Sequence, residues 1–247
     1  FIRKMEEEMN KEEKNRVEEI ANNNGYGTDV NPYTTEYSGR IFMNYMKKGS
    51  VLELGPAEGV MTNMLYPHFS DYTVVDGAEI FVRNLKNRFQ DIKGFTSLFE
   101  EYETQKKYDN IVMGHVLEHV DNPVAVLKKY MNFLEDDGVI VAAVPNCNSL
   151  HRLAAVKMGM LEKANSLSET DYKVGHRRVY SYKEFIADFQ KAGFEIVKSG
   201  GYWLKPLSNR QIEESWSKEM IWAFMELGED YPEIAAEIYV IAKKGKM

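Results

Sequence analysis

Two short segments of the sequence carry residues that suit the binding of a nucleoside. Residues 53–59 read Glu-Leu-Gly-Pro-Ala-Glu-Gly, a strand signal that ends in small residues and leads into a helical pattern. Because glycine lacks a side chain, the backbone of such a turn can approach a ligand closely. Asp76 ends the next β-rich run, where a carboxylate can accept hydrogen bonds from both hydroxyls of a ribose. The turn and Asp76 together predict a site for an adenosine.

The residues of the turn distinguish between two classes of adenosine ligand. A nicotinamide dinucleotide site favours Gly-x-Gly-x-x-Gly, and here Ala57 and Val60 stand at the second and third glycine positions. Glu53 and Glu58 also place negative charge beside the turn, which would repel a pyrophosphate. A cationic sulfonium ligand suits that charge better. The sequence therefore disfavours a nicotinamide-dependent oxidoreductase, which stays as an alternative.

Alternating strand and helix signals place these residues in an α/β fold. Between residues 50 and 146, short β-rich runs alternate with amphipathic helical stretches, as in βαβ units that build a parallel sheet. The expected strands are residues 51–54, 72–76, 95–98, 109–113 and 139–144, the last one stopped by Pro145. The expected helices are residues 60–66, 78–90 and 123–134. Because ligands bind at the carboxyl ends of such strands, Gly55 and Asp76 fall at the predicted site.

The second half of the chain departs from this rhythm in two places. Residues 149–172 have helical spacing without a neighbouring strand, which predicts a cap over the sheet. The sheet is expected to continue with a helix at 182–192 and with strands at 194–197 and 237–242. The insert at 200–231 holds all three tryptophans, and we expect them to pack in the protein core instead of stacking on a ligand. We predict a single domain with four parts: an N-terminal helical segment (1–49), a cofactor-binding core (50–146), a cap (147–181) and the C-terminal part of the sheet with the Trp-rich insert (182–247).

Several motifs follow one another in an order that resembles a known enzyme family. They are ELGxxxG at 53–59, Asp76, YDNIV at 108–112, VLEHV at 116–120, LxxxG at 134–138, PN at 145–146, GHRRVYS at 175–181 and AGFE at 192–195. In order and spacing the chain resembles class I S-adenosylmethionine-dependent methyltransferases, within the branch that includes the ubiquinone-biosynthesis O-methyltransferases. The resemblance extends over residues 50–197.

The resemblance implies the fold and the roles of individual residues. It implies a doubly wound, Rossmann-like sheet of seven strands with the last strand antiparallel, and S-adenosyl-L-methionine as the cofactor, which leaves as S-adenosyl-L-homocysteine. The implied contacts are Glu53, Gly55 and Gly59 with the methionine half, Asp76 with the ribose hydroxyls, Leu98 and Phe99 with the adenine, and Gly114 and His115 under the methyl group. Pro56, Ala57 and Gly77 complete the predicted cofactor-binding set. Ala57 stands where the family usually has a glycine, and its methyl group would narrow the pocket.

Residues after the fourth expected strand are candidates for holding a metal or moving a proton. His115, Glu118 and His119 stand at i, i+3 and i+4, which places them on one face if the segment is helical. In the ubiquinone-type enzymes, two carboxylates and a histidine at this spacing are associated with a divalent metal. Here His115 stands at the position of the first carboxylate, and a site with this additional histidine would favour zinc over magnesium. The alternative, which we favour, is that Glu118 and His119 brace the turn without a metal. His115 and His176 are the predicted catalytic bases, although methyl transfer can also proceed by alignment alone.

Composition narrows the classes of partner. A formal net charge of −7 argues against a general affinity for nucleic acid, and the charged residues at 5–20 predict a solvated helix without chemistry. Cys147 is the single cysteine, so it cannot form an intramolecular disulfide. The sequence contains no apolar run long enough to span a bilayer, and residues 1–8 lack the apolar core of a secretory signal. We therefore expect a cytoplasmic enzyme without nucleic-acid or membrane partners, which acts on a small-molecule acceptor such as a sugar or natural-product hydroxyl or amine. The alternatives are a non-catalytic scaffold of the same fold and a methyltransferase of protein side chains.

Overall fold

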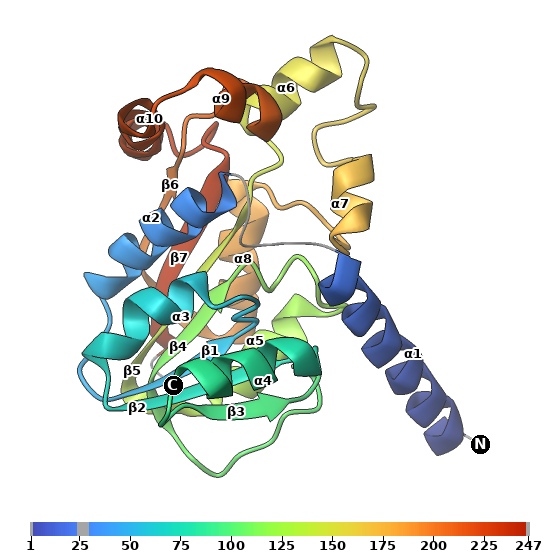
Figure 1. Cartoon of the computed structure of the whole chain (residues 1–247), viewed down its shortest axis with the longest axis vertical. Coiled ribbons are helices and arrows are strands. Elements are labelled where there is room, and N and C mark those ends of the chain that lie inside the picture. Colours follow the sequence, from blue (N-terminus) through green and yellow to red (C-terminus); the bar gives the residue numbers. More distant parts are fainter. Residues whose placement is uncertain (1, 24–29, 246–247) are drawn as a thin grey trace.

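A seven-stranded sheet forms the centre of the computed structural model, which describes residues 2–23 and 30–245 (Figure 1). The strands are β1 (Ser50–Leu54), β2 (Asp71–Asp76), β3 (Lys93–Thr96), β4 (Tyr108–Gly114), β5 (Leu134–Pro145), β6 (Phe194–Tyr202) and β7 (Glu237–Lys244). Their order across the sheet is β3-β2-β1-β4-β5-β7-β6, and β7 runs antiparallel to both of its neighbours. The predicted fold class, a doubly wound sheet with an antiparallel last strand, is confirmed.

Helices cover both faces of the sheet and also lie beyond the carboxyl ends of its strands. They are α1 (Ile2–Asn23), α2 (Asn31–Met43), α3 (Val60–Leu65), the 3-10 helix η1 (Tyr66–His68), α4 (Glu79–Arg88), α5 (Pro123–Met131), α6 (Leu150–Lys157), α7 (Glu169–Lys173), α8 (Tyr182–Ala192), α9 (Asn209–Ser215) and α10 (Lys218–Asp230). Helices α2, α3, α4 and α10 contribute to the core on one face, and α5 and α8 to the core on the other. Within the described ranges, none of these helices combines the length and the apolar character needed to cross a membrane.

The residues of strand β1 reflect the packing of helices on both faces of the sheet. Leu52 and Leu54 pack into one core cluster and Val51 into the other, so every residue of the strand is buried. A strand covered on both faces favours apolar residues at all positions. Glu53 is the one ionisable residue of this strand, and only 2% of the residue is exposed. A carboxyl group is kept in such a place where hydrogen bonds or a ligand satisfy it.

One strand lies at a different position from the one expected. All other predicted strands fall within the observed ones, but β3 (Lys93–Thr96) begins before the predicted range of 95–98. The next residues leave the sheet, because the backbone N–H of Ser97 donates to the carbonyl of Asp76 and Leu98 begins a turn. Leu98 and Phe99 therefore follow the end of β3 instead of belonging to it, which brings them to the edge where ligands bind.

Two inserts lie beyond the carboxyl ends of the strands, in the upper part of Figure 1. Helices α6 and α7 occupy the region predicted to form a cap, and α9 and α10 form the Trp-rich insert. Trp203 is 2% exposed, Trp222 lies with its ring centroid 5.5 Å from that of Tyr37, and Trp216 lies 4.6 Å from Phe224. The three tryptophans thus pack within the insert and against α2, as expected.

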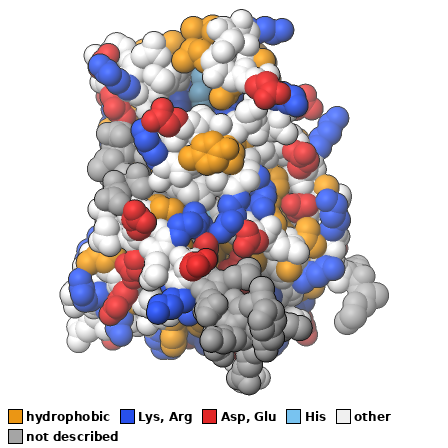
Figure 2. Space-filling model, turned by 90° about the vertical axis from the view of Figure 1, so that its right-hand side faces the viewer, with side chains coloured by type: hydrophobic (Ala, Val, Ile, Leu, Met, Phe, Trp, Pro, Cys, Tyr) orange, Lys and Arg blue, Asp and Glu red, His pale blue; other side chains and the backbone are white. Residues whose placement is uncertain are grey.

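Charges of both signs are mixed on the surface. Figure 2 shows acidic and basic side chains next to one another on the face that it draws, outside the grey residues. Acidic and basic side chains of the described residues also form ion pairs, such as Lys173 with Glu169 in α7 and Lys93 with Asp71 at the edge of the sheet. This face therefore presents a mixture of charges and no single basic area.

Candidate active site

One large cavity lies at the carboxyl ends of β1, β2 and β4 and extends up to the cap. Its volume is about 1330 Å³, which exceeds the range of roughly 300–1,000 Å³ typical of small-ligand pockets and leaves room for two ligands side by side. Its walls come from α1, the turn after β1, the ends of β2 and β4, and both inserts. The predicted site residues that line it are Glu53, Gly55, Pro56, Ala57, Asp76, Gly77, Leu98, Phe99, Gly114, His115 and His176.

The turn after β1 is built from residues in the left-handed conformation. Gly55, Ala57 and Gly59 have φ angles of 63°, 46° and 78°, which fold the backbone tightly around the end of the strand. Gly59 then begins α3. A Cβ atom on Gly59 would lie 2.4 Å from Nη2 of Arg88 on the neighbouring helix α4. Gly59 thus packs behind the turn and does not line the cavity wall, so the structure does not support its predicted contact with the methionine half.

Replacing Ala57 with glycine is expected to stabilise the unliganded protein by about 0.5–1 kcal/mol. A left-handed φ costs an alanine about 1–2 kcal/mol, and the greater freedom of glycine in the unfolded chain offsets part of that gain. Ala78→Gly is the matched control, because Ala78 is buried with a φ of −97° and has no such strain to relieve. It should lower the stability instead. Urea denaturation measures both effects, and a lower midpoint for Ala57→Gly than for the wild type would contradict the interpretation.

Two buried carboxyl groups flank the turn. Oε2 of Glu53 accepts hydrogen bonds from the hydroxyl groups of Thr62 (2.7 Å) and Tyr72 (2.8 Å). Asp76 accepts from two backbone N–H groups at 3.2 and 2.9 Å, the first of which belongs to the turn after β1. Burial outweighs these hydrogen bonds and raises the pKa of Glu53 to about 7 and the pKa of Asp76 to about 6. A ligand that offers hydroxyl groups or positive charge would satisfy both carboxylates.

Helix α1 forms the wall opposite the sheet. A Cβ atom on Gly77 would lie 2.8 Å from Cγ1 of Val17, and Nζ of Lys14 pairs with Glu101 at 2.7 Å. The expected helix is present, and its described side chains are exposed or half-buried, but α1 also lines the cavity, which was not expected. The sequence contains only a weak indication that one face of this helix packs on the protein: Val17 and Ile20 stand three residues apart within an otherwise charged segment.

His115 follows β4 directly and faces two carboxylates. Its φ of 58° is left-handed, and its Nδ1 lies 3.3 Å from Oε1 of Glu118 and 3.9 Å from Oε2 of Glu237. Burial lowers the pKa of His115, but the hydrogen bond to Glu118 and the charge of Glu237 outweigh burial and raise the pKa to about 9. The imidazole then holds its proton at neutral pH. This argues against the predicted role of His115 as a base and makes it a hydrogen-bond donor.

In metal-free buffer, the wild type is expected to lose stability relative to His115→Gln as the pH rises. Folding raises the pKa of His115 above its ordinary value, so the stabilisation is fully present below a pH of about 6.5 and is lost as the pH passes about 9. The difference in the free energy of unfolding should shrink by roughly 2 kcal/mol, after allowance for partial exposure of the ring. Urea titrations at pH of about 6 and about 10 measure it. A difference that stays constant over this range would rule out a buried imidazolium.

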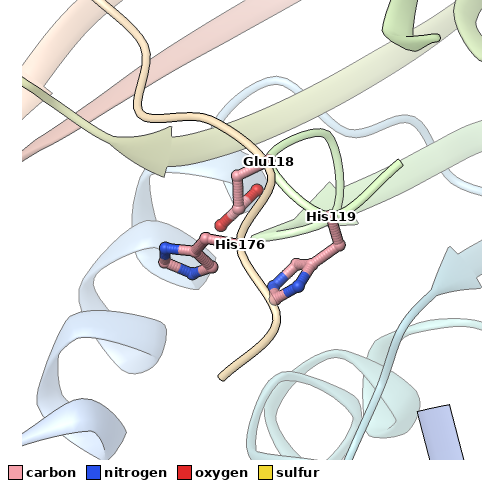
Figure 3. A group of neighbouring side chains, drawn as sticks. All are labelled: Glu118, His119 and His176. Atoms are coloured by element: carbon pink, nitrogen blue, oxygen red, sulfur yellow. The ribbon is translucent and has the colours of Figure 1, made fainter. Parts of the chain in front are cut away.

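A cluster of three side chains forms beside His115. Residues 115–120 adopt turns, so the interpretation that His115, Glu118 and His119 share one helix face is wrong. Glu118, His119 and His176 come together instead, with one possible ligand atom of each within 4.8 Å of the others. Figure 3 shows the three side chains as neighbours, two from the turn after β4 and His176 from the segment after α7. The sequence offered no spacing that could connect His176 to the other two.

Two arginines hold these segments together. Nε of Arg177 donates to the carbonyl of His119 at 2.9 Å, and its Nη1 pairs with Asp121 at 2.7 Å. Nη1 of Arg178 donates to the carbonyl of Leu117 at 2.9 Å. The VLEHV and GHRRVYS motifs are therefore in direct contact, and the arginines fix the turn that carries the cluster.

The cap is braced by a buried ion pair that also reaches His176. Nη1 of Arg152 in α6 lies 3.0 Å from Oδ2 of Asp171 in α7, and both residues are buried. The other carboxylate oxygen, Oδ1, lies 3.0 Å from Nδ1 of His176. Burial alone would raise the pKa of Asp171, but hydrogen bonds from His176 and Ser168 and the charge of Arg152 hold it well below its usual range. The orientation of His176 thus depends on the closed form of the cap.

Comparison with known proteins agrees with this arrangement. Residues 15–199 match the family described as "Methyltransferase domain". Among solved structures, the chain is similar to the plantazolicin methyltransferase BpumL in complex with S-adenosylhomocysteine, with 15% identity, a TM-score of 0.61 and coverage of 96% of this chain and 99% of that one. It is also similar to the N-methyltransferase NodS from Bradyrhizobium japonicum WM9 in complex with S-adenosyl-L-homocysteine (13% identity, TM-score 0.58, coverage of 88% of each chain).

A third similar structure contains an acceptor as well as the cofactor product. It is the 1,6-didemethyltoxoflavin-N1-methyltransferase of Burkholderia thailandensis, with 14% identity, a TM-score of 0.61 and coverage of 88% of this chain and 80% of that one. At these identities the structural likeness establishes the fold. Because the family match extends over most of the sequence, the chain belongs to the methyltransferase domain family.

Proposed function

We propose that this protein transfers the methyl group of S-adenosyl-L-methionine to a small-molecule acceptor and releases S-adenosyl-L-homocysteine. The observation that carries the proposal is the continuous cavity that joins the turn after β1 and Asp76 to a capped chamber where a second ligand can lie. Family membership supports it, as do the similar proteins whose structures hold S-adenosylhomocysteine. Since the cavity walls come from all four predicted parts of the chain, we also propose that these parts act as one domain.

In this proposal the cofactor lies across the ends of β1, β2 and β4. Asp76 would accept both ribose hydroxyls, and Glu53 and Glu58 would favour the cationic sulfonium over a pyrophosphate. The remaining contacts follow the sequence prediction: Gly55, Pro56, Ala57 and Gly77 along the backbone side, Leu98 and Phe99 beside the adenine, and Gly114 and His115 beneath the methyl group. Glu53 then serves the amino end of the cofactor, with Thr62 and Tyr72 fixing its carboxylate.

The reaction is a displacement at the methyl carbon. An oxygen or nitrogen of the acceptor forms the new bond to carbon while the carbon–sulfur bond breaks and its electron pair stays on sulfur. Alignment of the two ligands in one cavity supplies much of the rate. Of the two predicted bases, His176 suits the removal of the acceptor proton better, because Asp171 holds its Nδ1 and leaves Nε2 to accept, whereas His115 already carries a proton.

The acceptor end of the cavity favours a small polar molecule. Lys205, Glu237 and His151 line it beneath the cap. Burial lowers the pKa of Lys205 to about 8 and raises the pKa of Glu237, so both groups gain from polar partners on a ligand. A sugar or natural-product hydroxyl or amine fits this mixture, and the enclosing cap favours such an acceptor over a protein side chain. We also propose, from the order and spacing of the sequence motifs, that the chain falls within the branch that includes the ubiquinone-biosynthesis O-methyltransferases.

Calorimetric titration tests the proposal directly. We expect S-adenosylhomocysteine to bind with micromolar affinity at one molecule per chain, and NAD to give no heat of binding. A panel of small hydroxyl and amine acceptors can then be screened for formation of S-adenosylhomocysteine from S-adenosylmethionine. Absence of S-adenosylhomocysteine binding, with or without added metal, would overturn the proposed function and leave only the fold.

A further inference from the structure

Glu118 is a buried carboxyl group whose oxygens are not satisfied. The residue is 0% exposed, and neither oxygen accepts a hydrogen bond of good geometry from the protein. Nδ1 of His115 lies 3.3 Å from Oε1, which supplies charge on one side only. A buried carboxylate without sufficient partners is strongly unfavourable, so a second electropositive group is expected beside it.

Two imidazoles beside Glu118 are oriented as metal ligands usually are. Nδ1 of His119 lies 3.3 Å from the carbonyl oxygen of Gly175, and Nδ1 of His176 lies 3.0 Å from Oδ1 of Asp171. Both partners are acceptors, so in each ring the proton belongs on Nδ1 and the lone pair on Nε2. A carbonyl or carboxylate behind each histidine is the usual support for an imidazole that binds a metal through its other nitrogen.

The three side chains are close enough to share one ion. One ligand atom of each lies within 4.8 Å of the others, and it is the one such group of three found within residues 2–23 and 30–245. Bonds of about 2.1 Å in a tetrahedral site place ligand atoms about 3.4 Å apart, so rotations of the side chains must draw them inward. In Figure 3 the segment that carries His176 crosses the view between the two imidazoles, and their ring centroids lie 4.8 Å apart.

We propose that Glu118, His119 and His176 bind a divalent transition-metal ion, with Zn²⁺ as the matching probe, and that this ion fastens the cap segment to the turn after β4. Two imidazoles and one carboxylate suit zinc better than magnesium or calcium, which prefer sets of oxygen ligands. His119 and His176 line the cavity, so the open position of a three-ligand site faces the acceptor chamber.

The two ends of the site belong to different parts of the fold. Glu118 and His119 lie in the turn after β4, whereas His176 is held by Asp171, which in turn pairs with Arg152 of the cap. An ion shared between them therefore adds a link between the core and the cap. The role of His176 as a base, proposed above, therefore applies only to the metal-free form: with the ion bound, its Nε2 has no free lone pair, and methyl transfer depends on alignment of the two ligands. The inference deepens the proposed function but is tested without any methyl transfer.

Metal binding is measured on untagged protein that has been treated with chelator and dialysed. We expect one Zn²⁺ per chain with a Kd in the micromolar range or below, and much weaker binding of Mg²⁺. Glu118→Gln and His176→Asn should each weaken Zn²⁺ binding at least 30-fold, and Asp171→Asn by about 10- to 100-fold through the loss of support for His176. His68→Asn is the matched control, because His68 is exposed and distant from the cluster in sequence. Circular dichroism of each apo variant verifies folding, and His119→Asn replaces any variant that fails to fold.

Proteolysis tests the link to the cap. Lys157 and Lys163 are exposed trypsin sites in the cap, and Zn²⁺ should slow their cleavage at least 10-fold in the wild type and leave it unchanged in Glu118→Gln. The inference is overturned if the wild type binds no Zn²⁺, if Glu118→Gln and His176→Asn bind it as well as the wild type does, or if the ion leaves the cleavage rate unaltered. Titration of the same samples with S-adenosylhomocysteine separates these outcomes from a failure of the proposed function.

Discussion

Replacing Asp76 with alanine is expected to weaken the binding of S-adenosylhomocysteine by about 100-fold or more. The carboxylate ends β2 at the wall of the cavity and holds the turn after β1 through a backbone hydrogen bond. A hydrogen bond to a charged group contributes about 1.5–3 kcal/mol, and a ribose offers two hydroxyl groups. Their loss corresponds to about 3 kcal/mol at the least, at about 1.4 kcal/mol for each factor of ten. Calorimetric titration of the variant measures the change.

The control for this variant lies on the same strand. Asp71 begins β2 at the opposite end and pairs with Lys93 and Lys106. Asp71→Asn removes the same charge from the same strand and should leave the affinity within about twofold, because exposed ion pairs contribute little. Thermal unfolding of both variants verifies that β2 and its helices stay folded. If Asp76→Ala folds and binds S-adenosylhomocysteine as tightly as the wild type does, Asp76 does not contact the ribose.

Replacing Arg152 with methionine is expected to open the cap, with trypsin cleavage at Lys157 and Lys163 accelerated about 100-fold. The guanidinium is buried, pairs with Asp171 and donates to the carbonyl groups of Ala164 and Ser166. Methionine fills similar space but removes the positive charge beside Asp171 and leaves it with only its hydrogen bonds from Ser168 and His176. Breaking a buried ion pair costs about 3–5 kcal/mol, and the remaining hydrogen bonds place the expected cost at about 3 kcal/mol. Proteolysis of a locally open form follows its equilibrium population when closing is fast, so the cleavage rate reports the change.

Arg210→Met provides the comparison for the cap variant. Arg210 pairs with Glu214 at 3.0 Å in α9, but its side chain is 88% exposed. Such a pair contributes about 0.5 kcal/mol or less, so the cleavage rate in the cap should stay within about twofold of the wild type.

The buried pair between Arg152 and Asp171 also makes the stability of the cap depend on pH. Because the folded-state pKa of Asp171 is lowered, the stabilisation by this pair is present above a pH of about 4 and is lost as the pH falls below it. Equal cleavage rates for Arg152→Met and Arg210→Met at neutral pH would show that the buried pair does not hold the cap.

The fold could be predicted because its signals are local. The acidic residues Glu53 and Asp76 stand near the carboxyl ends of the apolar runs of β1 and β2, so both could be placed at the site from the sequence. Helix α8 begins and ends at the predicted residues, since Ser181 forms a capping box with Glu184 and Gly193 ends the helix in the left-handed conformation. In each case neighbours in the sequence determine the structure.

The features that escaped prediction depend on partners far apart in the chain. The charge of His115 depends on Glu237 at the start of β7 as well as on nearby Glu118. His176 reaches Glu118 only because Arg177 and Arg178 join their two segments. Gly59 matched a binding motif, yet its space is taken by α4. Spacing along the sequence contains no information on such contacts.

The position of α1 has a kinetic consequence. The helix meets the wall near Gly77 through Val17, and it meets the other end of the cavity through an ion pair between Glu13 and Arg177. The helix therefore lines the cavity at the end of Gly77 and at the end of Arg177. A displacement of α1 as one unit would then widen the cavity at both ends together, so the departures of the demethylated cofactor and of the methylated product would be coupled to one movement.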